Sequence, residues 1–202
     1  MDRTTSVKIE YISLVGLSGT GKTTVGKILA KKLNAKLLDS DKVIEKQEKL
    51  AVTEIFKNFG EAHFRKLETD FLLSLTVENA EAGQSTSGRP NLAKRILSCG
   101  GGLPITPGNM DCLLALGQVV YLQTSTEKLV ERLATAHDRP LLKNADKNGE
   151  EQNEHVLRSR LSELFELRHE VFERAQIIVK TDGLTPQQVA DRVIANLKAS
   201  KS

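Results

Sequence analysis

Residues 16–24 read Gly-Leu-Ser-Gly-Thr-Gly-Lys-Thr-Thr, and this stretch decides the fold. It satisfies the pattern G-x-x-x-x-G-K-[ST], which wraps the phosphates of a nucleoside triphosphate. The apolar run at the end of 7–15 predicts a buried strand before the loop, and apolar residues at helical spacing predict a helix over 22–33 after it. Because glycines permit close approach and a helix N-terminus offers unpaired N–H groups, this strand–loop–helix unit predicts a phosphate site.

The side chains of the loop indicate separate tasks. Lys22 can reach the β- and γ-phosphates, and the Thr23 hydroxyl can ligate Mg²⁺. The alternative is a chance glycine-rich turn, which the flanking strand and helix make less favoured. The predicted ATP-binding residues of the loop are Ser18, Gly19, Thr20, Gly21, Lys22, Thr23 and Thr24.

Composition narrows the class of protein. The 202 residues are 39% hydrophobic and 27% charged, which suits one domain over 1–202 with a sizeable core. A net charge of +3 does not argue for nucleic acid and is compatible with a small anionic substrate. Cys99 and Cys112 show no pairing or metal spacing, no apolar run approaches about 20 residues, and residues 1–6 lack a signal peptide's apolar region. We therefore expect a cytoplasmic monomer that binds neither nucleic acid nor membrane.

Predicted strands and helices alternate along the chain. This order predicts an α/β fold with three layers, in which a five-stranded parallel sheet has helices on both faces. The further strands are expected at 35–38, 95–99, 119–122 and 177–179, and the helices at 42–59 (two short ones), from 61, at 107–116, after a capping box at Thr124–Glu127, at 154–175 and from Pro186.

Two carboxylates follow the second predicted strand. Ligands of open α/β sheets bind outside the carboxyl ends of strands, so Asp39 and Asp41 are placed for chemistry. We assign Asp39 to Mg²⁺, and Asp41 to contact an acceptor hydroxyl and take its proton. The alternative is that Asp41 simply caps the helix that follows.

Cationic and glycine residues predict an anion site. Arg65 lies beside the apolar stripe of its helix with acidic residues at i−4 and i+3, although this could be a solvated ion pair. Gly100–Gly102 follow a strand and can donate N–H groups to a ligand, although they could form a flexible turn. Arg168 falls on the apolar face of its helix, where a charge needs an anionic partner.

Two polar segments interrupt the pattern. Residues 79–91 predict a surface loop, and 135–154 predict a lid. Arg139 on the lid would close over the phosphates and exclude water, although it could be an ordinary loop arginine. Together these features predict phosphoryl transfer to a small, hydroxylated, anionic acceptor, with Lys22, Asp41 and Arg139 as catalytic residues and helices within 42–78 holding the acceptor.

The chain resembles the shikimate kinase family. The matching pieces are the loop, Leu38–Glu45, Glu54–Phe56, Phe59–Gly60–Glu61 with Phe64–Arg65, Gly100–Gly102, Arg139–Leu142, and Arg168 before Phe172. The resemblance implies ATP-dependent phosphorylation of the shikimate 3-hydroxyl on a nucleoside monophosphate kinase-like fold.

The resemblance also implies site residues. Asp41, Arg65, Gly101 and Arg168 would line the shikimate site, and Arg132 and Pro186 would flank the adenine. Residues 79–91 and the segment after Leu142 look longer than the family's usual connections. Two alternatives stay open, a small-molecule kinase of the gluconate kinase type and a non-catalytic nucleotide-binding relative.

Overall fold

A computed structural model describes residues 11–82, 95–134 and 150–199 of the chain. Its described strands form one sheet of five strands in the order β2-β3-β1-β4-β5, and every neighbouring pair is parallel. All carboxyl ends therefore lie at the same edge, as the alternating pattern predicted. The strands are β1 (Tyr11–Val15), β2 (Lys36–Asp39), β3 (Arg95–Ser98), β4 (Gly117–Gln123) and β5 (Ile177–Lys180).

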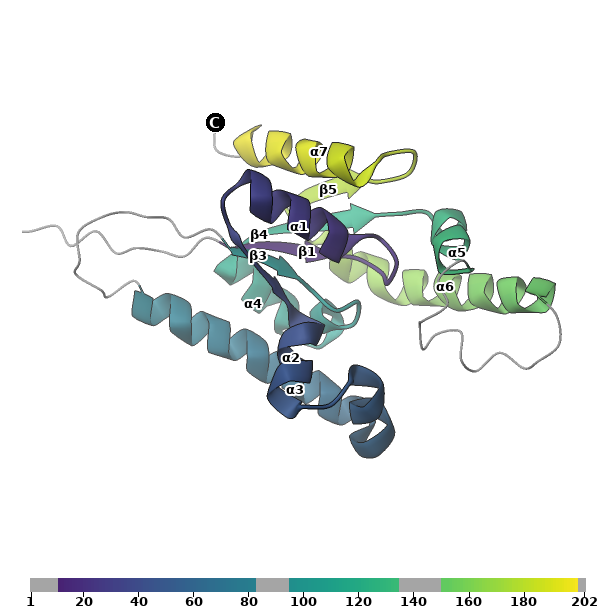
Figure 1. Ribbon diagram of the computed structural model, residues 1–202, viewed down its shortest axis with the longest axis horizontal. Coiled ribbons are helices and arrows are strands. Elements are labelled where there is room, and N and C mark those ends of the chain that lie inside the picture. Colours follow the sequence, from purple (N-terminus) through teal and green to yellow (C-terminus); the bar gives the residue numbers. More distant parts are fainter. Residues whose placement is uncertain (1–10, 83–94, 135–149, 200–202) are drawn as a thin grey trace, which may run out of the picture.

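Helices cover both faces of this sheet, which gives the predicted three layers (Figure 1). Helices α1 and α7 lie on one face, while α3, α4 and α6 lie on the other. The helices are α1 (Lys22–Lys32), α2 (Ser40–Glu48), α3 (Val52–Ala82), α4 (Asn109–Leu116), α5 (Thr126–Ala134), α6 (Glu150–Glu173) and α7 (Pro186–Ala199), with a short 3-10 turn at Leu103–Ile105.

Apolar side chains on both faces hold the layers together. Leu14 of β1 packs toward Leu29 of α1 and Val193 of α7, and all three are 0% exposed. On the opposite face, Tyr121 of β4 lies against Phe172 of α6, with ring centroids 5.2 Å apart. Each such burial stabilises the fold by about 1.5–3 kcal/mol. A strand covered on both faces is apolar along most of its length, which explains the sequence of β1, where Ser13 is the one polar residue.

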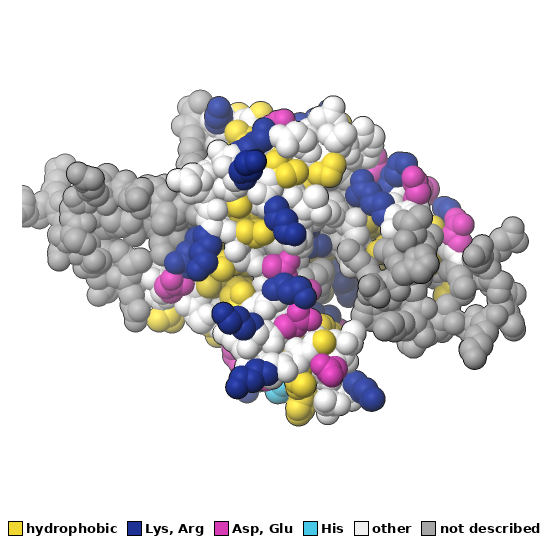
Figure 2. Space-filling model, viewed as in Figure 1, with side chains coloured by type: hydrophobic (Ala, Val, Ile, Leu, Met, Phe, Trp, Pro, Cys, Tyr) yellow, Lys and Arg dark blue, Asp and Glu magenta, His cyan; other side chains and the backbone are white. Residues whose placement is uncertain are grey.

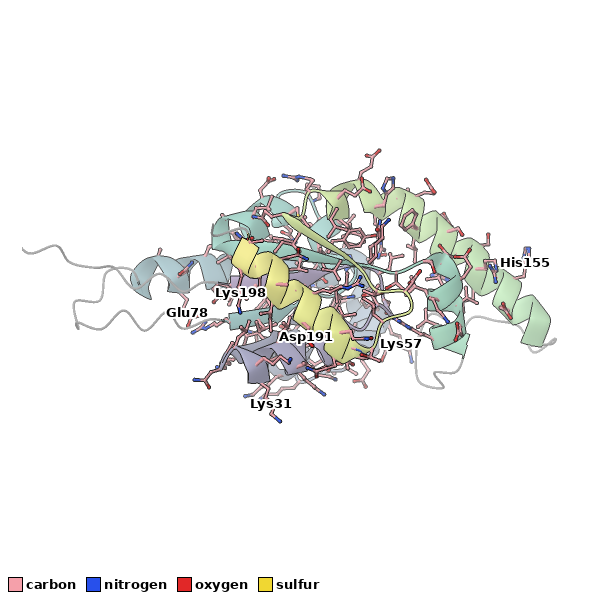
Figure 3. The ribbon with its side chains drawn as sticks, turned by 90° about the horizontal axis from the view of Figure 1, so that it is seen from above. Lys31, Lys57, Glu78, His155, Asp191 and Lys198 are labelled. Atoms are coloured by element: carbon pink, nitrogen blue, oxygen red, sulfur yellow. The ribbon has the colours of Figure 1, made fainter. Side chains whose placement is uncertain are left out.

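Ion pairs link some of the neighbouring elements. Arg95 at the start of β3 donates two hydrogen bonds of 2.6 Å to Glu78 of α3, which anchors that helix to the amino-end edge of the sheet. Figure 3 labels Glu78 and His155 at opposite ends of the molecule, on α3 and α6. The same view shows Asp191 on α7, where it pairs with Lys32 of α1.

A small separate cluster joins α2 to α3. Ile44, Ile55 and Phe64 are 3% exposed or less and pack on one another. Gly60 has φ 83° and ψ 169°, so α3 consists of two helical segments on either side of it. This confirms the predicted stop at Gly60 and the longer helix that follows.

Several predicted boundaries were wrong. Helix α3 continues to Ala82 and α6 begins at Glu150, so parts of the predicted 79–91 loop and 135–154 lid are helical. The remaining parts of these segments, 83–91 and 135–149, and residues 7–10 of the first strand lie outside the described residues. The cap of α5 is Ser125, whose hydroxyl accepts from the Lys128 N–H at 3.3 Å, because Thr124 is instead hydrogen-bonded to Thr181.

Candidate functional site

The phosphate loop connects β1 to α1 in a conformation that requires glycine. Gly16, Gly19 and Gly21 have φ values of 139°, 92° and 90°, where a side chain would be strained. The Lys22 Nζ donates to the Gly16 and Leu17 carbonyls at 2.8 Å each, and the residue is 8% exposed. The ammonium therefore lies over the loop beside the N-terminus of α1, where an anion is favoured by both charge and N–H groups.

A cluster of oxygen atoms forms where three elements meet. The Thr23 hydroxyl of α1 donates to Asp39 Oδ2 at 2.8 Å and lies 3.1 Å from the Ser98 hydroxyl of β3. Carboxylate and hydroxyl oxygens are the ligand type that Mg²⁺ prefers. The donor set thus fits the predicted metal residues Thr23 and Asp39. The sequence analysis missed Ser98, and its signal was a hydroxyl residue at the end of a strand.

Asp41 lies one residue inside α2, beside the glycine triplet. The N-cap of α2 is Asp39, which accepts from the Lys42 N–H at 3.3 Å, so the alternative that Asp41 caps the helix is wrong. Asp41 accepts a hydrogen bond from Ser40 at 3.1 Å, and a Cβ at Gly100 would overlap its carboxylate. Burial, and then the neighbouring Asp39, raise the pKa of Asp41. A carboxylate whose pKa is raised is a better proton acceptor than an exposed carboxylate with an ordinary pKa.

Two guanidinium groups lie against the same glycine triplet. The Arg168 Nη1 donates to the Gly101 carbonyl at 3.2 Å, and a Cβ at Gly102 would overlap the Arg65 guanidinium. Burial, and then the charge of Arg65, lower the pKa of Arg168. The structure therefore brings the two cations together, in a place where an anion would relieve their repulsion.

Glu68 lies behind Arg65, and the sequence did not indicate that its carboxylate is buried. Its carboxylate accepts from Arg65 at 2.6 Å and is 0% exposed, so the pair is not the solvated one that the alternative supposed. Burial raises the pKa of Glu68 to about 7 even though Arg65 opposes the shift. Its Oε1 is buried and has no hydrogen-bond partner within the described residues. Glu61 holds the other side of Arg65 at 2.7 Å.

Two adjoining cavities open at this edge of the sheet. The first, about 480 Å³, joins the phosphate loop to the acidic and glycine residues, and the second, about 340 Å³, lies between α5 and α7. The first is lined by Ser18, Gly19, Gly21, Lys22, Thr23, Thr24, Asp39, Asp41, Lys42, Glu45, Val52, Thr53, Ser98, Cys99, Gly100 and Gly101. The second is lined by Gly19, Thr20, Gly21, Thr24, Val25, Arg132, Thr181, Leu184, Pro186 and Val189.

The structure thus assembles most of the predicted site residues at one edge. Arg132 and Pro186 line the second cavity, and Arg132 Nη1 lies 3.4 Å from the Gly19 carbonyl. Besides Ser98, the sequence analysis missed five residues that line the first cavity, namely Lys42, Glu45, Val52, Thr53 and Cys99. The predicted lid residue Arg139 lies outside the described residues.

Comparisons with known proteins find one family along nearly the whole chain. The sequence profile of the shikimate kinase family matches residues 18–198. A shikimate kinase from Sulfurihydrogenibium sp. is 35% identical over 190 residues, which are 94% of this chain and 99% of that protein. The structure of a shikimate kinase from Acinetobacter baumannii in complex with shikimate superimposes with a TM-score of 0.77 at 30% identity, over 96% of each chain. The shikimate kinase of Bacteroides thetaiotaomicron gives a TM-score of 0.78 at 29% identity, over 94% of this chain and 98% of that one.

Among the described residues, no helix combines the length and apolar character needed to cross a membrane.

Proposed function

The chain belongs to the shikimate kinase family, and we propose that it transfers the γ-phosphoryl group of ATP to the 3-hydroxyl of shikimate. One observation carries the assignment beyond family membership. A single cavity joins the phosphate loop to Asp41, Gly100 and Gly101, so a donor phosphate and an acceptor hydroxyl can meet in it. A protein that only sensed nucleotides would not need the acceptor half of this cavity.

The donor half has a place for each part of ATP. The loop amides and Lys22 bind the β- and γ-phosphates, with Ser18, Gly19, Thr20, Gly21, Thr23 and Thr24 forming the wall. The adenine occupies the second cavity between Arg132 and Pro186. Lys22 turns from the Gly16 and Leu17 carbonyls to the phosphates, which are stronger acceptors because they are charged.

Thr23, Asp39 and Ser98 are the residues that would hold Mg²⁺, directly or through water. When bound, this ion neutralises charge on the β- and γ-phosphates.

The acceptor half binds shikimate by its carboxylate. Arg65 and Arg168 bind that group, and the N–H groups of Gly101 and Gly102 assist. The predicted role of the Gly100 N–H is corrected, because this group donates to the Ser40 hydroxyl at 2.8 Å. Glu61 and Glu68 fix the Arg65 fork before shikimate arrives. The anion also compensates the positive charges of the two arginines. Binding is therefore strengthened, because it relieves the repulsion between them.

Asp41 then orients the 3-hydroxyl toward the γ-phosphate. The hydroxyl oxygen forms the new bond to phosphorus, the bond from the γ-phosphorus to the β,γ-bridging oxygen breaks, and the hydroxyl proton passes to Asp41. ADP leaves with the electron pair of the broken bond. The raised pKa of Asp41 suits a group that must take a proton and release it again in each cycle. We also propose that Arg139 closes over the phosphates to exclude water.

All residues assigned here come from one chain, so we propose that the monomer is active. Cys99 and Cys112 are free thiols, which fits a reducing compartment such as the cytoplasm.

A coupled assay of ADP release tests the function. Purified protein with ATP and Mg²⁺ is given shikimate, gluconate or no acceptor, and the product is identified by mass spectrometry. We expect ADP and shikimate 3-phosphate with shikimate alone. Turnover of gluconate alone would support the gluconate kinase alternative, and ATP binding without turnover of either acceptor would support a non-catalytic relative.

A further inference from the structure

Phosphoryl transfer moves negative charge across the cavity. Before the reaction the γ-phosphate lies over the loop with Lys22, and afterwards it is attached to the acceptor oxygen beside Asp41. Arg65 and Arg168 are occupied by the acceptor carboxylate in the proposed function. The new phosphate therefore arrives next to Asp41, whose charge opposes it, and a cation on the acceptor side would stabilise the product.

Lys42 is a cation on that wall of the cavity. It follows Asp41 in the first turn of α2 and lines the 480 Å³ cavity. Its side chain is 76% exposed, so the ammonium can move on its long stem, whereas Lys22 is 8% exposed and lies over the loop. Figure 2 shows that basic and acidic side chains are interspersed on the face that carries α2.

A neighbouring carboxylate holds the Lys42 ammonium at the cavity. Its Nζ lies 2.6 Å from Glu45 Oε2, and the other oxygen of Glu45 accepts from the Val52 N–H at 3.1 Å. Glu45 raises the pKa of Lys42, and the charges of Asp39 and Asp41 raise it further. The ammonium is thus charged and within electrostatic reach of both acidic residues that face the reacting groups.

We propose that Lys42 leaves Glu45 and binds the phosphate of the phosphorylated product, an inference that rests on the proposed function. The exchange is chemically reasonable because a phosphate ester offers three oxygens and more negative charge than a carboxylate that already accepts from a backbone N–H. Lys42 is therefore a product-binding residue that acts on the acceptor side, as Lys22 acts on the donor side. Unphosphorylated shikimate lacks the phosphate that this contact requires.

The test is Lys42→Met, with Lys46→Met as the matched control. Lys46 lies one turn further along α2, is exposed and does not line the cavity. Binding of synthetic shikimate 3-phosphate is measured by calorimetric titration in the presence of ADP, and the KM for shikimate is measured by ADP release. We expect Lys42→Met to weaken the product about threefold to tenfold, as for a charge-assisted contact at an exposed site. Its shikimate KM should stay within about twofold, and Lys46→Met should change neither quantity.

A second variant tests the exchange of partners. Glu45→Gln weakens the competing acceptor, so product binding should tighten, and this gain should vanish in the double variant with Lys42→Met. Unchanged product binding in Lys42→Met overturns the inference. An equal loss of shikimate and product binding also overturns it, because Lys42 would then only shape the pocket. If wild-type protein neither phosphorylates shikimate nor binds the product, the proposed function itself fails.

Discussion

Replacing Arg168 by methionine should weaken substrate binding without weakening the fold. In the unliganded chain, burial and the neighbouring Arg65 lower the pKa of Arg168, so its charge is held against an unfavourable environment. Methionine removes this charge and keeps an unbranched apolar stem at the same position of α6. The bound shikimate carboxylate, however, loses one of its two guanidinium partners.

The two effects can be given magnitudes. Loss of one partner from a desolvated charge pair costs about 2–5 kcal/mol, which raises the dissociation constant for shikimate about 30-fold to several thousand-fold. The gain in stability from removing the repulsion between Arg168 and Arg65 is smaller, because Arg168 is partly exposed and solvent screens its charge. Since its hydrogen bond to the Gly101 carbonyl is lost as well, we expect a net change in stability between zero and a gain of about 1 kcal/mol.

Calorimetric titration with shikimate and urea unfolding followed by circular dichroism measure both quantities. Arg160→Met is the matched control, because Arg160 is exposed on the same helix two turns earlier. Arg168→Lys should fall between wild type and Arg168→Met in affinity, since a lysine keeps the charge but not the planar fork. A variant Arg168→Met that is markedly less stable yet binds shikimate normally would refute the acceptor site.

Three further predictions concern the rest of the site. Lys22→Ala should lower kcat by about a hundredfold or more with an unchanged melting curve, because the ammonium compensates phosphate charge, and steady-state kinetics check this. Gly100→Ala should abolish turnover while ATP binding persists, since its Cβ would overlap the Asp41 carboxylate; equal turnover would contradict this placement. Glu68 has a pKa of about 7 against an ordinary 4.5, so from about pH 5 to 7 the folded state keeps a proton that the unfolded state has lost. The stability that this group contributes is therefore fully present below pH 4.5 and is lost as the pH rises through 7. Glu68→Gln should remove this part of the pH dependence from urea midpoints measured between pH 5 and 8.

The features that sequence predicted well depend on local spacing. The loop pattern, the five apolar runs and the stop at Gly60 follow from short-range sequence, and parallel topology then places every strand end at one edge. The shared edge of the parallel sheet places Asp41 beside the glycine triplet, although about 60 residues separate them in the chain. The site was therefore predictable wherever its residues follow strands.

Features that depend on side-chain burial were not predictable in the same way. Nothing in the spacing of Arg65 and Glu68 distinguishes a solvated pair from one whose carboxylate is 0% exposed. Ser98 becomes a candidate ligand because β3 lies between β1 and β2, an order that sequence does not display. Lys42 and Glu45 line the cavity because of how α2 packs on α3.

The sequence left open whether Gly100–Gly102 approach a ligand closely or form a flexible turn. A flexible turn would use glycine for its backbone freedom, yet none of Gly100, Gly101 and Gly102 has a positive φ. What matters is the absent side chain. A Cβ at the first would overlap Asp41, one at the second would lie 3.3 Å from the Ser18 nitrogen of the phosphate loop, and one at the third would overlap Arg65. The triplet therefore sets how closely the phosphate loop, the proton acceptor and the carboxylate site approach, and any side chain there would move the donor away from the acceptor.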